Sequence, residues 1–261
     1  MNRRTFLTGS VAAGVSLSTA GCLDTITAFG TGDVVLDEPD YDAFEQVQQA
    51  AEDGYIDHPV YGDEFPEVTV SDAFTEREIT TTDFVGEQHF LMTFIFTRCP
   101  EACPVVTQNL ARVQRDAHEQ GYEDEFAFLP MTFDPENDTP DVLYEFSEAM
   151  GADPDDENWY FLRPDSSEHA REVVEDELGV FYEYIDEDER EEYGNATTED
   201  VDDEFETEGY DPENTEMLYS HQYIIYLVNE DGYVERDYNG LSYIPNPIEL
   251  VQDVETLRER W

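Results

Sequence analysis

From residue 67 onward, continuous apolar runs alternate with segments in which apolar residues are three or four positions apart. Continuous apolar runs at 90–96 and 126–133 are typical of strands that are buried on both faces. Each run is followed by a segment, 106–117 and 142–149, in which apolar residues recur three or four positions apart. That spacing places them on one face of a helix. The pattern therefore predicts two successive units of a buried strand and a helix.

The remaining apolar clusters complete an alternating order of strands and helices. They predict short strands at 68–70, 79–84 and 159–162, a helix at 170–178, a hairpin of strands at 223–228 and 233–238, and a terminal helix at 247–261. Pro130 lies inside an apolar run, and because proline cannot donate to a ladder it favours an edge strand or a bulge. Strands that alternate with helices and end in a hairpin indicate an α/β fold with a mixed central sheet flanked by helices.

Composition divides the chain into three parts. Residues 1–22 have the pattern of an export segment, and residues 23–66 are rich in Gly, Asp and Pro. We interpret 23–66 as a tether and N-terminal extension with one amphipathic helix at 41–51. Residues 67–261 form the predicted domain. Within it, residues 186–216 hold many acidic and few apolar side chains, which predicts an acidic surface insertion.

Acidic residues dominate the charge. The chain has 65 Asp and Glu against 12 Lys and Arg, a net charge of −53, together with 16 Tyr and 16 Phe. A disordered acidic chain lacks such aromatic content, so we expect a folded core beneath an acidic surface. This surface predicts adaptation to molar salt, where the Debye length falls to ~3 Å and like charges are screened. Nucleic acid is excluded as a partner because its phosphates would be repelled.

The N-terminus carries two export signals. Arg3 and Arg4 precede an apolar, small-residue run, the pattern of a twin-arginine signal. Thr19-Ala20-Gly21-Cys22 resembles a lipobox, which predicts lipidation of Cys22 and anchoring on the outer face of the cytoplasmic membrane. The alternative is an uncleaved membrane anchor. The run at 8–20 has about 13 residues, fewer than the ~20 that span a bilayer as a helix.

Cys99 and Cys103 are the two cysteines of the predicted domain, and they lie where a buried strand gives way to a helix. Residues four apart share a helix face, so both sulfurs can converge on one ion or on each other. The positive end of the helix dipole stabilises thiolate, the form that binds metal or attacks. The alternative is a structural disulfide, which is usual for a thiol pair in an exported protein.

The segment 97–104, Thr-Arg-Cys-Pro-Glu-Ala-Cys-Pro, resembles the SCO/SenC family of copper proteins, whose signature is a strand, C-P-x-x-C-P and a helix. Three further segments match in the same order: D-P-E-N-D-T-P at 134–140, L-G-V-F-Y at 178–182, and Ser220-His221 before the hairpin. The resemblance covers about residues 67–240. This chain departs from the family in its acidic insertion and in Ser220, where many members carry an acidic residue.

The resemblance implies a thioredoxin-like fold and a copper site made by Cys99, Cys103 and His221. Soft thiolates favour Cu(I), whereas imidazole accepts Cu(I) and Cu(II), so such a site can hold either. The implied role is a metallochaperone for the dinuclear copper centre of cytochrome c oxidase subunit II. Asp134 either supports the site or faces a partner, or it merely ends a strand before proline, and Met217 is a candidate fourth ligand. The other histidines match nothing and are expected at the surface: His58, His89, His118 and His169.

An extracytoplasmic thiol–disulfide oxidoreductase is the alternative function, because Cys99 and Cys103 could cycle between dithiol and disulfide. Thioredoxin-like reductants typically carry a cis-proline just before the closing hairpin. This chain has Ser220-His221-Gln222 there, which counts against that alternative. Redox activity can also accompany metal transfer in the family. A purely structural or adhesive role leaves the cysteine pair unexplained.

Overall fold

The computed structural model describes residues 34–185 apart from 42 and 101, then 218–239 and 247–261. The predicted export signal with Cys22, the acidic insertion at 186–216 and Met217 lie outside the described residues. Among the described residues, no helix is both long and apolar enough to cross a membrane.

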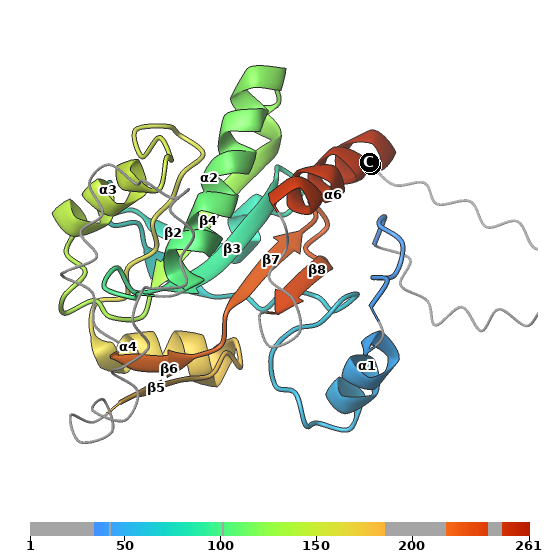
Figure 1. Ribbon diagram of the computed structural model, residues 1–261, viewed down its shortest axis with the longest axis horizontal. Coiled ribbons are helices and arrows are strands. Elements are labelled where there is room, and N and C mark those ends of the chain that lie inside the picture. Colours follow the sequence, from blue (N-terminus) through green and yellow to red (C-terminus); the bar gives the residue numbers. More distant parts are fainter. Residues whose placement is uncertain (1–33, 42, 101, 186–217, 240–246) are drawn as a thin grey trace, which may run out of the picture. The chain divides into compact units, whose positions relative to one another are not determined.

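A four-stranded mixed sheet in the order β4-β3-β7-β8 forms the centre of the fold (Figure 1). β3 (His89–Ile95) runs parallel to β4 (Phe126–Thr132) and antiparallel to β7 (Ile224–Val228), which pairs with β8 (Val234–Asn239). Every residue of β3 and β4 is buried, as their continuous apolar runs predict. Each fully buried large apolar side chain stabilises the fold by about 1.5–3 kcal/mol. The predicted mixed sheet and closing hairpin are confirmed.

β4 is the edge strand of this sheet, as Pro130 predicts. The predicted strand at 159–162 forms only isolated parallel bridges to β4, through Trp159 and Leu162. The Leu162 N–H donates to the Pro130 carbonyl over 2.8 Å. A short, bridged segment on this side requires no donor from Pro130, so proline is accommodated there.

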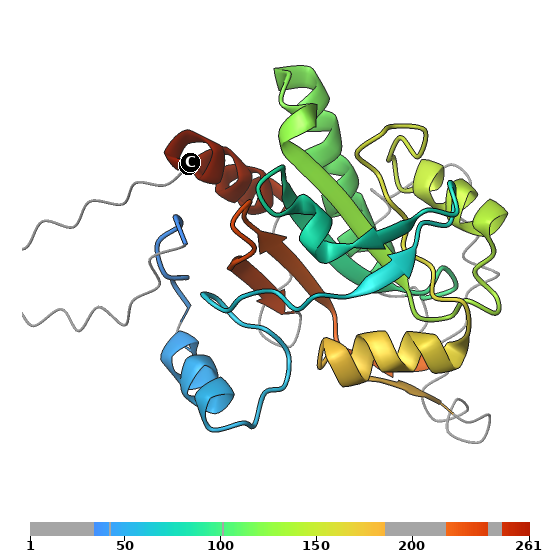
Figure 2. The same cartoon turned by 180° about the vertical axis from the view of Figure 1, so that it is seen from behind.

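The helices pack around the sheet at the predicted places. They are α2 (Ala102–Gln120), α3 (Pro140–Ala149), α4 (Ser167–Arg171), which continues as a π-helix over Glu172–Glu177, and α6 (Pro247–Arg260). α2 and α6 lie side by side (Figure 1, Figure 2). The Arg258 guanidinium of α6 lies 3.7 Å from the Tyr122 ring centroid and 2.8 Å from a Glu125 oxygen. The result is a thioredoxin-like arrangement of a mixed sheet flanked by helices.

Two local predictions are wrong. The strand expected at 79–84 is only β2 (Glu78–Thr80), paired antiparallel with β1 (Thr69–Ser71), and residues 81–84 form a 3₁₀ turn. The Asp83 carboxylate accepts the Thr80 N–H over 2.9 Å, and this cap starts the turn. The spacing at 142–149 also placed Val142 on the buried face of α3, but Val142 is 38 % exposed and Leu143 is buried in its place.

The N-terminal extension packs against the closing hairpin from residue 35 onward. The buried Glu235 carboxylate accepts the backbone N–H groups of Val35 and Leu36 over 2.8 Å each. Farther along, the Phe65 N–H donates to the Gly232 carbonyl over 2.8 Å. The predicted amphipathic helix is present as α1 (Phe44–Glu52). The extension is therefore bound along its described length, which its polar composition did not predict.

Candidate metal centre

A cluster of Cys99, Cys103 and His221 lies at the carboxyl ends of the parallel strands β3 and β4. β3 leads into the loop that carries Cys99, and Cys103 lies in the first turn of α2. His221 ends β6 (Tyr219–His221), which pairs antiparallel with β5 (Tyr182–Tyr184) just before β7. One ligand atom from each of the three residues lies within 4.8 Å of the others. The structure thus brings together residues 118 positions apart, with Cys103 Sγ 3.4 Å from His221 Nε2.

Cys99 and Cys103 form no disulfide with each other, and both are fully buried. The expectation that a shared helix face aligns them is wrong, because α2 begins only at Ala102 and Cys99 lies in the preceding loop. The Cys99 N–H donates to the Phe96 carbonyl over 3.2 Å, so the chain turns directly after β3. This turn, rather than helical spacing, carries the Cys99 sulfur toward Cys103.

The two thiols differ in acidity although they are neighbours. Burial by itself raises the pKa of Cys99, but hydrogen bonds from Cys103 and His221 stabilise its thiolate and lower its pKa to about 5. Burial raises the pKa of Cys103 well above its ordinary value, and the hydrogen bond and negative charge of Cys99 raise it further. The pair therefore shares one proton at neutral pH, with Cys99 as the thiolate.

His221 presents its Nε2 atom to the sulfurs. Its Nδ1 lies 3.2 Å from the Gln222 carbonyl, which can only accept, so Nδ1 carries a proton and Nε2 is the atom available to a metal ion. Aromatic rings surround the imidazole, with centroid distances of 4.4 Å to Tyr223, 5.0 Å to Phe133 and 5.7 Å to Phe96. The ring is therefore oriented for binding on one side and packed on the others.

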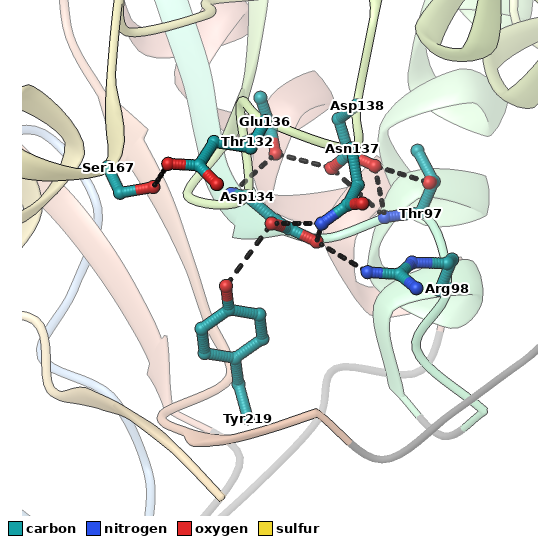
Figure 3. A network of polar contacts seen from close by, with 9 residues as sticks. All are labelled: Thr97, Arg98, Thr132, Asp134, Glu136, Asn137, Asp138, Ser167 and Tyr219. Atoms are coloured by element: carbon teal, nitrogen blue, oxygen red, sulfur yellow. Dashed lines mark hydrogen bonds and ion pairs between the residues drawn. The ribbon is translucent and has the colours of Figure 1, made fainter.

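Asp134 links the strand of His221 to the loop of Cys99 (Figure 3). Its carboxylate is 2 % exposed and accepts hydrogen bonds from Arg98 over 3.2 Å and from the Tyr219 hydroxyl over 3.2 Å. The Asn137 side chain donates to the same carboxylate over 2.9 Å. Arg98 immediately precedes Cys99, and Tyr219 lies two residues before His221 on the same face of β6. Tyr219 was missed in the sequence, where only its spacing from His221 marks it.

Asp138, the second acid of the D-P-E-N-D-T-P segment, ties that segment to the end of β3. Its buried carboxylate accepts from the backbone and hydroxyl of Thr97 and from the Thr132 hydroxyl. Burial raises the pKa of Asp138 to about 6, although these hydrogen bonds oppose the rise. The Arg163 guanidinium donates to the Asp138 carbonyl over 2.9 Å. The segment therefore supports the cysteine loop through hydrogen bonds, and it contributes no residue to the described cluster of Cys99, Cys103 and His221.

Two histidines expected at the surface are buried. His58 is 7 % exposed, with Nδ1 3.1 Å from the Pro59 carbonyl, and His89 is 3 % exposed. The His89 ring packs against Phe126 and Trp261, and its Nδ1 accepts the Glu230 N–H over 2.9 Å. These neighbours come from distant parts of the chain, which local sequence does not indicate. The other two are more accessible: His118 is exposed, as expected, and His169 is partly exposed. None of the four belongs to the described cluster.

Comparisons with known proteins agree with this architecture. A curated relative, the SCO1 protein homolog of Bacillus subtilis, is 27 % identical over 180 residues, covering 69 % of this chain and 76 % of the relative. Yeast Sco1, solved with copper bound, has a TM-score of 0.52 at 16 % identity, covering 78 % of this chain and 91 % of its own. BsSco, described as a member of the Sco family of cytochrome c oxidase assembly proteins, has a TM-score of 0.50 at 23 % identity, covering 78 % and 97 %.

A family model described as SCO1/SenC matches residues 70–194, which include both cysteines and the D-P-E-N-D-T-P segment. The matched part ends before His221, which the structure nevertheless places beside the cysteines. The structural likenesses show the fold, and the family model and the curated relative together support membership of the SCO1/SenC family.

Proposed function

We propose that this protein is a copper chaperone that holds one copper ion with Cys99, Cys103 and His221 and passes it to the dinuclear copper centre of cytochrome c oxidase subunit II. The observation that carries the proposal is the convergence of two sulfurs and one imidazole nitrogen within 4.8 Å. The oxidase as destination is supported by BsSco, which is described as a cytochrome c oxidase assembly protein.

The donor set fits copper. Two sulfur ligands favour Cu(I), and the imidazole accepts both copper oxidation states. Cys99 is already ionised at neutral pH because its pKa is about 5, so Cys103 is the thiol that must lose a proton when copper binds. The sulfurs are fully buried and aromatic rings pack around His221, which limits the access of water to a bound ion.

Copper titration of the reduced protein tests the proposal. We expect one copper ion per chain, and Ala substitution of Cys99, Cys103 or His221 weakens binding in each case. His118→Ala is the matched control, because His118 is exposed and lies outside the cluster. If copper affinity is unchanged in His221→Ala, the three-ligand site is refuted.

We further propose that Asp134 is a positioning residue for the metal ligands. It holds Arg98 beside Cys99 and Tyr219 beside His221, so it couples the two halves of the site. Groups that orient metal ligands commonly change metal affinity about 10–100-fold when they are removed. Asp134 and Tyr219 would act through geometry, since neither belongs to the cluster of ligand atoms.

Tyr219→Phe isolates this role, because it removes one hydroxyl and leaves the aromatic packing. We expect copper affinity to fall about tenfold and the absorption and EPR spectra of the Cu(II) form to shift. Tyr144→Phe is the control: Tyr144 also donates to an aspartate, Asp155 over 3.1 Å, but on α3 and away from the cluster. Unchanged spectra in Tyr219→Phe would contradict a positioning role.

Export and anchoring belong to the same proposal. The twin-arginine pattern and the lipobox support a location on the outer face of the cytoplasmic membrane, with attachment through a lipid on Cys22. A single lipid chain gives marginal attachment, ~10⁴ M⁻¹, so stable anchoring requires two chains or a partner. Cys22→Ser should release the protein from membranes without altering copper binding. A variant that stays in the membrane fraction with its N-terminus intact would indicate an uncleaved anchor.

A thiol–disulfide oxidoreductase is the second candidate, favoured by one observation. Cys99 and Cys103 lie next to each other as thiols, and the lowered pKa of Cys99 makes it a thiolate at neutral pH. Oxidation of the pair would form one disulfide and pass two electrons to a disulfide substrate, which becomes two thiols. Turnover of a disulfide substrate that persists in His221→Ala would favour this function over metal transfer.

A further inference from the structure

A cleft of about 960 Å³ opens beside His221. The N-terminal extension forms one wall with residues 39–41 and 55–58, and residues 220–222 form another. Residues 236–239 of β8 and the first half of α6 complete it. Of the three candidate ligands, His221 alone is among the described residues that line the cleft, whereas both cysteines are fully buried. An incoming group therefore reaches the proposed copper site from the His221 side.

Carboxylates outnumber cationic side chains in the described lining of this cleft. Asp40, Asp57 and Glu249 are exposed in it, whereas Asp237 is largely buried and burial raises its pKa to about 7. The one arginine among the described lining residues, Arg236, is already paired, with Nε 3.0 Å from a carboxylate oxygen of α6. Asp40, Asp57 and Glu249 are exposed, so their attraction for a cation is strongest at low ionic strength. The cleft therefore favours a cationic occupant.

Exposed aromatic side chains flank the carboxylates. Phe181 is 50 % exposed and Tyr55 is 83 % exposed, and both line the cleft. The Phe181 carbonyl accepts the Gln222 N–H over 2.9 Å, so Phe181 is held next to the strand that ends in His221. Aromatic anchors beside complementary charge are the usual composition of a peptide-binding site.

We infer that this cleft binds an extended segment of the copper acceptor that carries Lys or Arg side chains and brings its own copper ligand to His221. The inference rests on the proposed chaperone function. A donor atom of the segment forms a bond to copper as the bond to His221 Nε2 breaks, and the oxidation state of copper does not change. Cys99 and Cys103, which are enclosed, release copper last. A second copy of this chain is a poor occupant, because it brings the same net charge of −53.

The test uses the full chain carrying Cys22→Ser, reduced and loaded with Cu(I). The probe is a short synthetic peptide with one methionine, one histidine and two arginines, and its partner peptide has glutamate in place of both arginines. We expect the arginine peptide to bind about tenfold more tightly by calorimetry. Combined Asp40→Asn and Asp57→Asn should abolish most of this preference, and Phe181→Ala should weaken both peptides alike.

The control variant combines Asp141→Asn and Glu145→Gln on α3, which removes two exposed acids outside the cleft. Equal affinity for the two peptides, or an equal loss in the control, would overturn the inference. Transfer of copper to a small chelator at the same rate as to the arginine peptide would also overturn it. Copper loading is measured first in every variant. A chain that binds no copper refutes the chaperone function but not the peptide-binding cleft. In that case peptide binding to the cleft is tested with the copper-free chain.

Discussion

The number of protons released when copper binds provides a quantitative test of the thiol pair. Cys99 has a pKa of about 5, and the pKa of Cys103 is raised well above its ordinary value, so the pair holds one proton at pH 7.5. Copper binding by two thiolates should therefore release about one proton. Two independent thiols with a pKa of ~8.5 would hold, and release, about 1.8 protons at this pH.

The affinity should follow from this count. One released proton makes the apparent affinity rise about tenfold per pH unit, whereas two would make it rise nearly a hundredfold. Affinity is therefore lost as the pH falls, and the slope steepens near pH 5, where Cys99 also becomes protonated. The comparison is made at pH 7.5, because at pH 8.5 two independent thiols with a pKa of ~8.5 would also release only about one proton.

Anaerobic calorimetry in buffers of different ionisation enthalpy measures the released protons directly. Cys22→Ser leaves Cys99 and Cys103 as the only thiols of the chain. Thiolate absorbance of the native and the urea-unfolded chain provides the control, because unfolding should return both thiols to ordinary acidity. A release close to two protons, or to none, at pH 7.5 would refute the asymmetric thiol pair.

Three further predictions concern the fold that supports the site. Burial lowers the pKa of His89 to about 4, so between that value and ~6.5 the unfolded chain binds a proton that the folded chain does not. The free energy of unfolding should therefore fall by about 3 kcal/mol as the pH falls through this range. Urea unfolding at both ends of the range should show a smaller fall in His89→Gln. Gly179 and Gly54 both have positive φ, but a Cβ at Gly179 would lie 2.3 Å from the Asp57 carbonyl, whereas a Cβ at Gly54 meets nothing within 4 Å. Gly179→Ala should therefore destabilise the fold by about 1–3 kcal/mol more than Gly54→Ala. Equal melting temperatures of the two variants would contradict this. With a net charge of −53, the protein should lose its circular dichroism signal on dilution from molar to millimolar salt, and an unchanged spectrum would refute salt adaptation.

Elements determined by their own residues could be predicted from the sequence. The runs that became β3 and β4 are apolar throughout, and the apolar face of α2 recurs at helical spacing. The strand expected at 79–84 failed because Asp83 caps the backbone of Thr80, a contact that competes with strand pairing. His89 was placed at the surface because its Glu230 partner lies 141 residues away. Local pattern therefore predicts an element well and predicts its environment poorly.

The metal centre shows the same division between local pattern and distant contact. The C-P-x-x-C-P segment indicates which cysteines can bind a metal, but Cys99 precedes the helix, so their spacing does not align the sulfurs. The alignment depends on two aspartates that follow another strand. Asp138 holds Thr97, and Asp134 holds Arg98 on one side and Tyr219, 85 residues away, on the other. A segment that supplies no ligand thus connects both parts of the site. A substitution there would change how well copper is held while both cysteines remain intact, and for that reason Tyr219→Phe should alter copper spectra although no ligand is removed.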